Sequence, residues 1–282
     1  MHISLDSALG RQRRLNQVGE TISSIAAPTA AYSLRSITGG DPKAVRVRRS
    51  SDDSEQDFTV SEINSGALVS FVGSGNDGFV ETWYDQSGNS KDAVQATDAN
   101  QPKIVNSGSL VVDSSIAGID FDGGDFLVAS SVSGLEGSIS MFAVSVRDAS
   151  GYVVSPSNSS SGAKYFGIQE GASTSIANPR NTSNKTVSDS VSGADRLTFA
   201  VTTGATSTSV GANGSAVTTT TNDYGDDFAS SDLDQIAIGI LRTVSASGQF
   251  NGRIREILVY SSDQTSNRTA LETNINSYYS VF

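Results

Sequence analysis

The chain has 282 residues, of which 37% are hydrophobic and 17% are charged. It contains no cysteine and its single histidine is His2, so a disulfide framework, a thiolate metal site and catalysis by a Ser-His or Cys-His pair are excluded. The formal net charge of −11 predicts a surface that repels phosphate backbones, so nucleic acid is not an expected partner. No apolar run is long enough for insertion into a membrane. Residues 1–15 lack the apolar core of a secretion signal, which predicts assembly in a cytoplasm.

Residues 1–28 are predicted to form a partly helical arm in front of a domain that fills residues 29–282. Apolar side chains recur there at three- and four-residue spacing, and a basic cluster lies among them, while Gly10 and Gly19 weaken a continuous helix. Pro28 marks the boundary. Two interpretations stay open: the arm packs on the domain, or it anchors the chain to another protein. The candidate anchoring residues are Leu5, Leu9, Arg13, Arg14, Leu15, Val18 and Ile22.

From Ala30 onward the pattern is one of strands and turns. Residues 139–146 are apolar on both faces, which predicts a central strand between two layers. Asn213 and Gly214 predict a hairpin, because such a turn needs positive φ at both positions. Near the end, Leu271, Ile275 and Tyr278 share one helical face, with Ser266 as the expected N-cap. Further strands are predicted at residues 45–48, 79–84, 197–201, 236–241 and 254–260, and residues 118–127 are predicted to be strand-like around a turn at residues 122–125.

Regular strands and turns with few helices predict an all-β fold, a two-sheet antiparallel jelly-roll sandwich with a short C-terminal helix and an N-terminal arm. The segment Gly73–Gly78 fits the G-x-G-x-x-G pattern, but a strand follows it, where a phosphate-binding loop requires a helix. This segment is therefore expected to be a hairpin loop.

A carbohydrate site is predicted around the aromatic pair Trp83 and Tyr84. Strand alternation places the two rings on opposite faces, so one belongs to the core, and we expect that one to be Trp83. Arg46 and Arg48 either pair with nearby acidic residues or bind an acidic glycan. The candidate carbohydrate-binding residues are Tyr84, Asp85, Gln86, Asn89, Arg46 and Arg48.

Calcium is the one cofactor that the sequence leaves open. Aspartates in glycine-rich turns can supply oxygen ligands, although turn chemistry alone also selects them. The weak candidate ligands are Asp122, Asp125, Asp223 and Asp226.

Two parts of the chain resemble known families. The segments Val45-Arg-Val-Arg-Arg-Ser-Ser-Asp-Asp53 and Thr82-Trp-Tyr-Asp-Gln-Ser-Gly-Asn89 resemble the start of the catalytic domain of α-L-arabinofuranosidase B enzymes. The segment Phe250-Asn-Gly-Arg-Ile-Arg-Glu-Ile-Leu-Val-Tyr260 resembles the end of concanavalin-like or laminin-G-like jelly rolls. Both resemblances imply a concanavalin-like sandwich, and they leave residues 130–230 unmatched.

The family's activity is not expected to carry over. The resemblance implies an acid/base Asp soon after a strand that matches Ile236–Gly239, where this chain has Leu241 and non-acidic neighbours. Glu170 is the nearest counterpart of the family's nucleophile, by position only. Glu81, Asp85, Glu170 and Glu256 remain the carboxylates that a glycosidase would have to use in facing pairs.

Domains with the same two signatures also occur in phage and prophage structural proteins. By this analogy the chain is predicted to be a non-enzymatic virion structural, decoration or adhesion protein of a bacteriophage. It would be present in several copies, dock by its arm on capsid or tail proteins, and bind cell-surface glycans. The alternatives are a glycoside hydrolase that acts on polysaccharide and a stand-alone lectin.

Overall fold

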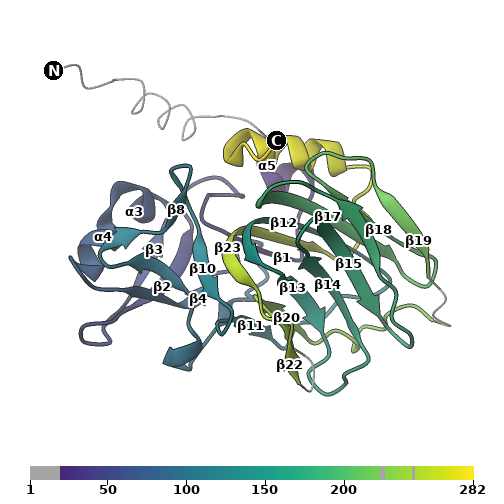
Figure 1. Ribbon diagram of the computed structural model, residues 1–282, viewed down its shortest axis with the longest axis horizontal. Coiled ribbons are helices and arrows are strands. Elements are labelled where there is room, and N and C mark those ends of the chain that lie inside the picture. Colours follow the sequence, from purple (N-terminus) through teal and green to yellow (C-terminus); the bar gives the residue numbers. More distant parts are fainter. Residues whose placement is uncertain (1–19, 223–225, 243–244) are drawn as a thin grey trace.

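A computed structural model of the protein describes residues 20–222, 226–242 and 245–282. The described part is almost entirely antiparallel β structure with one C-terminal helix, which confirms the predicted fold class (Figure 1). The predicted anchoring residues of the arm other than Ile22 lie outside the described residues, as does Asp223. The anchoring residues outside the described part are Leu5, Leu9, Arg13, Arg14, Leu15 and Val18.

Two layers of strands form the sandwich, and all their pairings are antiparallel. We call them the front layer and the back layer. The front layer contains β10 (Ile119–Asp122), β1 (Ala30–Ser33), β23 (Asn251–Tyr260), β12 (Ser138–Ala149), β17 (Asp195–Thr203), β18 (Ser207–Ala212) and β19 (Thr218–Thr221). The back layer contains β11 (Leu127–Ser130), β20 (Gln235–Ile238), β13 (Gly151–Ser157), β14 (Tyr165–Glu170), β15 (Thr174–Arg180) and β16 (Val187–Ser190).

A smaller side sheet lies beside the sandwich, on the left in Figure 1. It joins the two layers, because β6 pairs with β10 and β5 pairs with β11. Its strands are β2 (Lys43–Arg49), β3 (Glu55–Thr59), β4 (Gly78–Trp83), β5 (Ala93–Val94), β6 (Lys103–Asn106) and β7 (Ser109–Leu110). Two short hairpins complete the strands: β8 (Val112–Asp113) with β9 (Ile116–Ala117), and β21 (Leu241–Arg242) with β22 (Ala246–Ser247).

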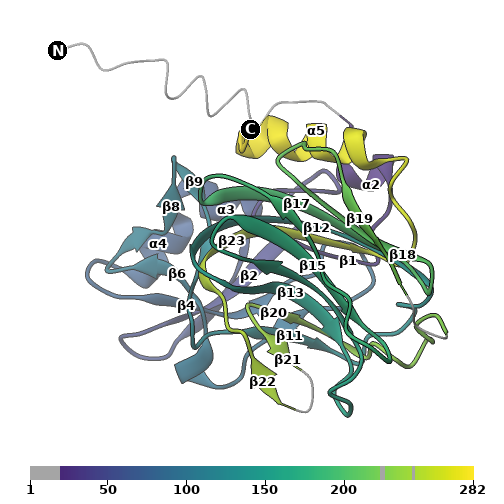
Figure 2. The same ribbon diagram turned by 45° about the vertical axis from the view of Figure 1, so that its right-hand side comes forward.

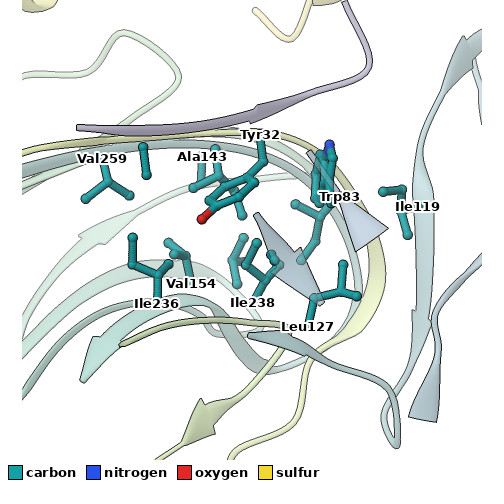
Figure 3. Close-up of a cluster of buried hydrophobic side chains, with 14 of the residues drawn as sticks. Tyr32, Trp83, Ile119, Leu127, Ala143, Val154, Ile236, Ile238 and Val259 are labelled. Atoms are coloured by element: carbon teal, nitrogen blue, oxygen red, sulfur yellow. The ribbon is translucent and has the colours of Figure 1, made fainter. Parts of the chain in front are cut away.

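The main core fills the space between the layers. Tyr32 and Trp83 lie there opposite Val154, Ile236 and Ile238 (Figure 3). The Trp83 side chain is fully buried, as expected from strand alternation. The predicted central strand is β12, which pairs with β17 on one side and β23 on the other. The predicted hairpin turn is confirmed between β18 and β19, where Asn213 and Gly214 have φ of 52° and 74°.

A second core lies on the outer side of the front layer, under α5 (Arg268–Tyr279) and α2 (Ile22–Ile25) (Figure 2). The C-terminal helix is confirmed, but its N-cap is Asn267 and not Ser266. Ile22 is fully buried in this core. This residue of the predicted arm therefore packs on its own domain, as one of the two open interpretations requires.

Two short helices of the side sheet were not predicted. They are α3 (Val60–Ser65), which begins with a capping box between Thr59 and Glu62, and α4 (Ala67–Val72). The segment Gly73–Gly78 connects α4 to β4, so the expected hairpin loop is wrong there. The glycines follow a helix and precede a strand, the reverse of the order that phosphate binding needs. A single-turn 3₁₀ helix, η1 (Asp98–Asn100), completes the described elements.

Candidate functional site

Three of the predicted carbohydrate-binding residues, Asp85, Gln86 and Asn89, lie in the loop after β4, and most of their hydrogen bonds go to the segment around β1. Asp85 Oδ1 accepts from the amides of Ala31 and Ser87, both at 2.9 Å. Gln86 donates to the Ser33 carbonyl and accepts from the Ile37 amide. Asn89 donates to the carbonyls of residues 28 and 29. These side chains hold the segment around β1 against the end of β4, which gives the motif a structural role.

Tyr84 and Arg46 lie together on the side sheet around Asp57. The Tyr84 hydroxyl donates to Asp57 at 2.7 Å, and Arg46 pairs with Asp57 at 3.3 Å and with Glu55 at 2.9 Å. Burial and the Asp57 carboxylate raise the pKa of Tyr84 to about 12. Arg46 thus has the nearby acidic partners that one of the two interpretations expects.

Arg48 is separated from this pair by its own contacts. Its guanidinium donates to Gln101 at 2.8 Å, pairs with Asp53 at 2.6 Å and lies over the Phe79 ring. The structure therefore divides the predicted carbohydrate site into a loop, a Tyr84–Arg46 group and Arg48. Sugar binding by any of the three stays a prediction.

Glu170 is fully buried on the inner side of β14. Its carboxylate pairs with Arg196 at 2.5 Å and accepts from Ser175 and Thr198 at 2.8 and 2.7 Å. Burial raises the pKa of Glu170, while the Arg196 guanidinium opposes this rise. The carboxylate is enclosed by its partners and does not reach the outer face of the back layer.

The other three carboxylates considered for hydrolysis also have separate surroundings. Glu256 binds Arg35 through both carboxylate oxygens, at 2.7 and 2.9 Å, and accepts from Ser33 and Tyr279. Asp85 holds the loop described above, and Glu81 contacts Thr82 in the side sheet. No two of the four carboxylates therefore share a direct hydrogen-bond partner.

The outer face of the back layer carries a cluster that the sequence did not reveal. Tyr152, Tyr165 and Leu241 pack together there, with the two rings edge to face and 6.4 Å between centroids. The Tyr152 ring lies on Gly167, where a Cβ atom would come within 2.7 Å of the ring. Leu241, near which the resemblance implies a catalytic acid, therefore packs on two tyrosines.

Hydrogen bonds fix the tyrosines and the strand that covers them. Asn178 donates to the Tyr152 hydroxyl at 2.6 Å, and Tyr165 donates to Asn184 at 3.2 Å. Burial raises the pKa of Tyr152. Ser155 and Ser157 donate to the carbonyls of residues 240 and 242, which holds β21 across β13.

Beyond this covered end, the outer face is accessible over β14, β15 and β16. Directly opposed residues in antiparallel strands share a face, so Gln169 lies beside Ile176, and Tyr165 lies beside Arg180. We call the accessible region the outer patch. It comprises Gln169, Ile176, Arg180, Asn184, Thr186 and Ser188, all partly or fully exposed.

The outer patch has the chemistry of a saccharide-binding surface. Its amides and hydroxyls can donate to and accept from sugar hydroxyls, Ile176 offers an apolar contact, and Arg180 adds a cation. None of its members is a carboxylate. The arrangement can bind a polar ligand, but it does not supply the two facing carboxyl groups of a glycosidase.

Two of the calcium candidates, Asp122 and Asp125, are used in a turn. Asp125 accepts from the amide of Asp122, and Asp122 accepts from the amide of Gly124. Asp226 lies elsewhere, where its backbone carbonyl accepts from Asn181. Across residues 20–222, 226–242 and 245–282, no group of three or more His, Cys, Asp or Glu side chains is placed to hold a metal ion. In the same ranges no helix is long and apolar enough to span a membrane.

The fold is similar to that of solved glycoside hydrolase family 54 α-L-arabinofuranosidases. One was soaked with a cyclic sulfate inhibitor (TM-score 0.66, 15% identity), and one is a glutamate-to-glutamine mutant soaked with 4-nitrophenyl α-L-arabinofuranoside (TM-score 0.68, 16% identity). Each similarity covers 89% of this chain but only 63% of the other. No family model matches the sequence, and no curated protein matches it either. The comparison confirms the predicted likeness in fold.

Proposed function

We propose that this protein is a non-catalytic glycan-binding protein and that saccharide binds to the outer patch. The observation that supports this most is the composition of the patch, which gathers amides, hydroxyls, one guanidinium and one aliphatic side chain on an accessible sheet face. Such groups match the hydroxyls and apolar faces of sugars. The likeness to enzymes that act on arabinofuranosides adds support for a saccharide ligand and for this fold.

Binding without hydrolysis is supported by two placements. Leu241 packs on Tyr152 and Tyr165, and Glu170 faces the interior in a pair with Arg196. A hydrolase is the second candidate, favoured by the fold likeness alone. Turnover of 4-nitrophenyl α-L-arabinofuranoside that is lost on changing one carboxylate would favour the hydrolase over our proposal.

The test of binding is a glycan array probed with the intact protein and two tryptophan variants. Ser188→Trp places a bulky ring at an exposed position of the outer patch and should lower binding at least about ten-fold, because it blocks the surface without touching the core. Gln56→Trp, at an exposed strand position of the side sheet, is the control and should bind as the unmodified protein does. Binding to no glycan, or equal binding by both variants, would count against the proposed site.

We propose that the protein is part of a bacteriophage particle, because domains with the same two sequence signatures also occur in phage structural proteins. Several copies on one particle would give avidity to weak individual sites. We expect full-length protein, but not protein lacking residues 1–19, to rebind particles stripped of this component. The truncation stops at residue 19 because Ile22 belongs to the buried core. Equal rebinding by both proteins would show that residues 1–19 do not anchor the chain.

A further inference from the structure

Arg180 is the only charged member of the outer patch. It ends β15 directly opposite Tyr165, and Asn178, two residues earlier on the same face, bonds Tyr152. A row of side chains runs across four strands there, from Gln235 through Ser157 and Tyr165 to Arg180. The guanidinium thus stands at the accessible end of a row whose other end is covered by β21.

The Arg180 guanidinium has no carboxylate partner among the described residues. Its Nε atom is buried and makes no hydrogen bond. Most other arginines of the described chain pair with acidic side chains; these are Arg35, Arg46, Arg48, Arg49, Arg196, Arg253, Arg255 and Arg268. Arg147 and Arg242 also lack a carboxylate partner among the described residues, but Arg147 donates to the carbonyls of residues 148 and 172, and Arg242 lies over the Phe126 ring. The Nε atoms of Arg147, Arg196 and Arg255 are unbonded as well, but other nitrogens of those guanidinium groups donate to described groups. Within the described residues Arg180 has none of these contacts, and a buried donor without a partner is costly.

The members of the outer patch beside Arg180 are neutral. Asn184 pairs with it as an isolated β-bridge, and Thr186 lies two residues further along, with its hydroxyl near the Asn178 amide. These groups suit sugar hydroxyls, whereas a guanidinium is matched by a planar or tetrahedral anion that accepts two parallel N–H bonds. The negative net charge makes a nucleic acid a poor source of that anion.

We propose that Arg180 binds the anionic group of an acidic saccharide, a carboxylate or a sulfate ester, and that the outer patch therefore selects acidic over neutral glycans. This inference rests on the proposed glycan-binding function and specifies the class of its ligand. Asn184 and Thr186 bind the hydroxyls of the same sugar, and Arg180 supplies the selectivity.

The experiment is a glycan array that contains carboxylated, sulfated and neutral glycans, followed by calorimetric titration with the strongest binder and its carboxyl-reduced or desulfated form. The unmodified protein should prefer the acidic form by about ten-fold or more, the value of one charge-assisted hydrogen-bonding pair. Arg180→Gln should remove this preference while it keeps the affinity for the neutral form. Arg180→Lys keeps the charge without the planar fork and should fall between the two.

Arg49→Gln is the matched control, because it removes the same charge from the side sheet, where Arg49 pairs with Asp52. It should leave the preference intact, and thermal unfolding shows that each variant is folded. Glycan binding without any acidic preference, or a preference that survives in Arg180→Gln, would overturn the inference but leave the proposed function standing. Binding to no glycan at all would overturn both. A preference of the unmodified protein for only the carboxylated or only the sulfated glycans would support the inference and identify the anion that Arg180 binds.

Discussion

Replacing Glu170 with alanine is expected to lower the free energy of unfolding by about 3–5 kcal/mol, because it leaves a buried guanidinium without its counter-ion. Glu170 and Arg196 are both fully buried, with 0% exposed side-chain area. Arg196 would keep only backbone carbonyls as acceptors, at residues 172, 174 and 193. Urea denaturation of the variant and the unmodified protein measures the difference.

Two controls make this result specific to the buried pair. Replacing both partners with apolar residues, Glu170→Leu with Arg196→Met, should restore much of the lost stability, since no buried charge remains. Lys43→Ala removes an ion pair whose lysine is 59% exposed and should cost less than about 1 kcal/mol. If Glu170→Ala were as stable as the unmodified protein, the carboxylate would not have the structural role assigned to it.

Replacing Asp125 with asparagine is expected to stabilise the protein at neutral to alkaline pH and to change little at pH 4. Burial raises the pKa of Asp125 to about 7, the Asp122 amide opposes this rise, and the Asp122 carboxylate adds to it. The folded state therefore holds the proton more tightly than the unfolded state does, and the protein loses stability as the pH rises from about 4 to about 7. The asparagine variant removes that loss, which is worth roughly 2–4 kcal/mol by pH 8.

The comparison is made by urea denaturation at pH 4 and pH 8. Glu136→Gln removes a carboxylate from an exposed position and is the control for the loss of one negative charge. A gain in Asp125→Asn that is equal at both pH values would contradict the titration of Asp125, since only ionisation gives a difference that grows with pH.

The strands of the sandwich could be predicted where each layer shows a simple pattern. The apolar faces of β12 and the Asn213–Gly214 turn are local signals, and the structure confirms both predictions. The helices α3 and α4 are only six residues each, too short for a helical period to emerge. The capping box at Thr59 and Glu62 was the one signal that could have revealed α3.

The outer patch could not be predicted from the sequence. The cluster of Tyr152, Tyr165 and Leu241 beside it is buried like a core, so the sequence does not show which face of the back layer points outward. In β13 every residue is buried, including the polar Ser155 and Ser157, so no alternation marks which side faces outward. Tyr152, Tyr165 and Asn178 meet only because β13, β14 and β15 are neighbours in the back layer. The Tyr-Asp-Gln-Ser-Gly-Asn segment, where the sequence predicts carbohydrate binding, holds the β1 segment in place.

The most direct test of the central claim is hydrogen exchange of the full-length protein with and without the glycan that binds most strongly on the array. If the glycan binds to the outer patch, exchange slows in peptides that cover residues 165–190, the strands and loop that form the patch. Residues 43–57 and 84–89 should exchange at unchanged rates. Slower exchange confined to those two segments, with none in residues 165–190, would place the glycan at the side sheet and rule out binding to the outer patch.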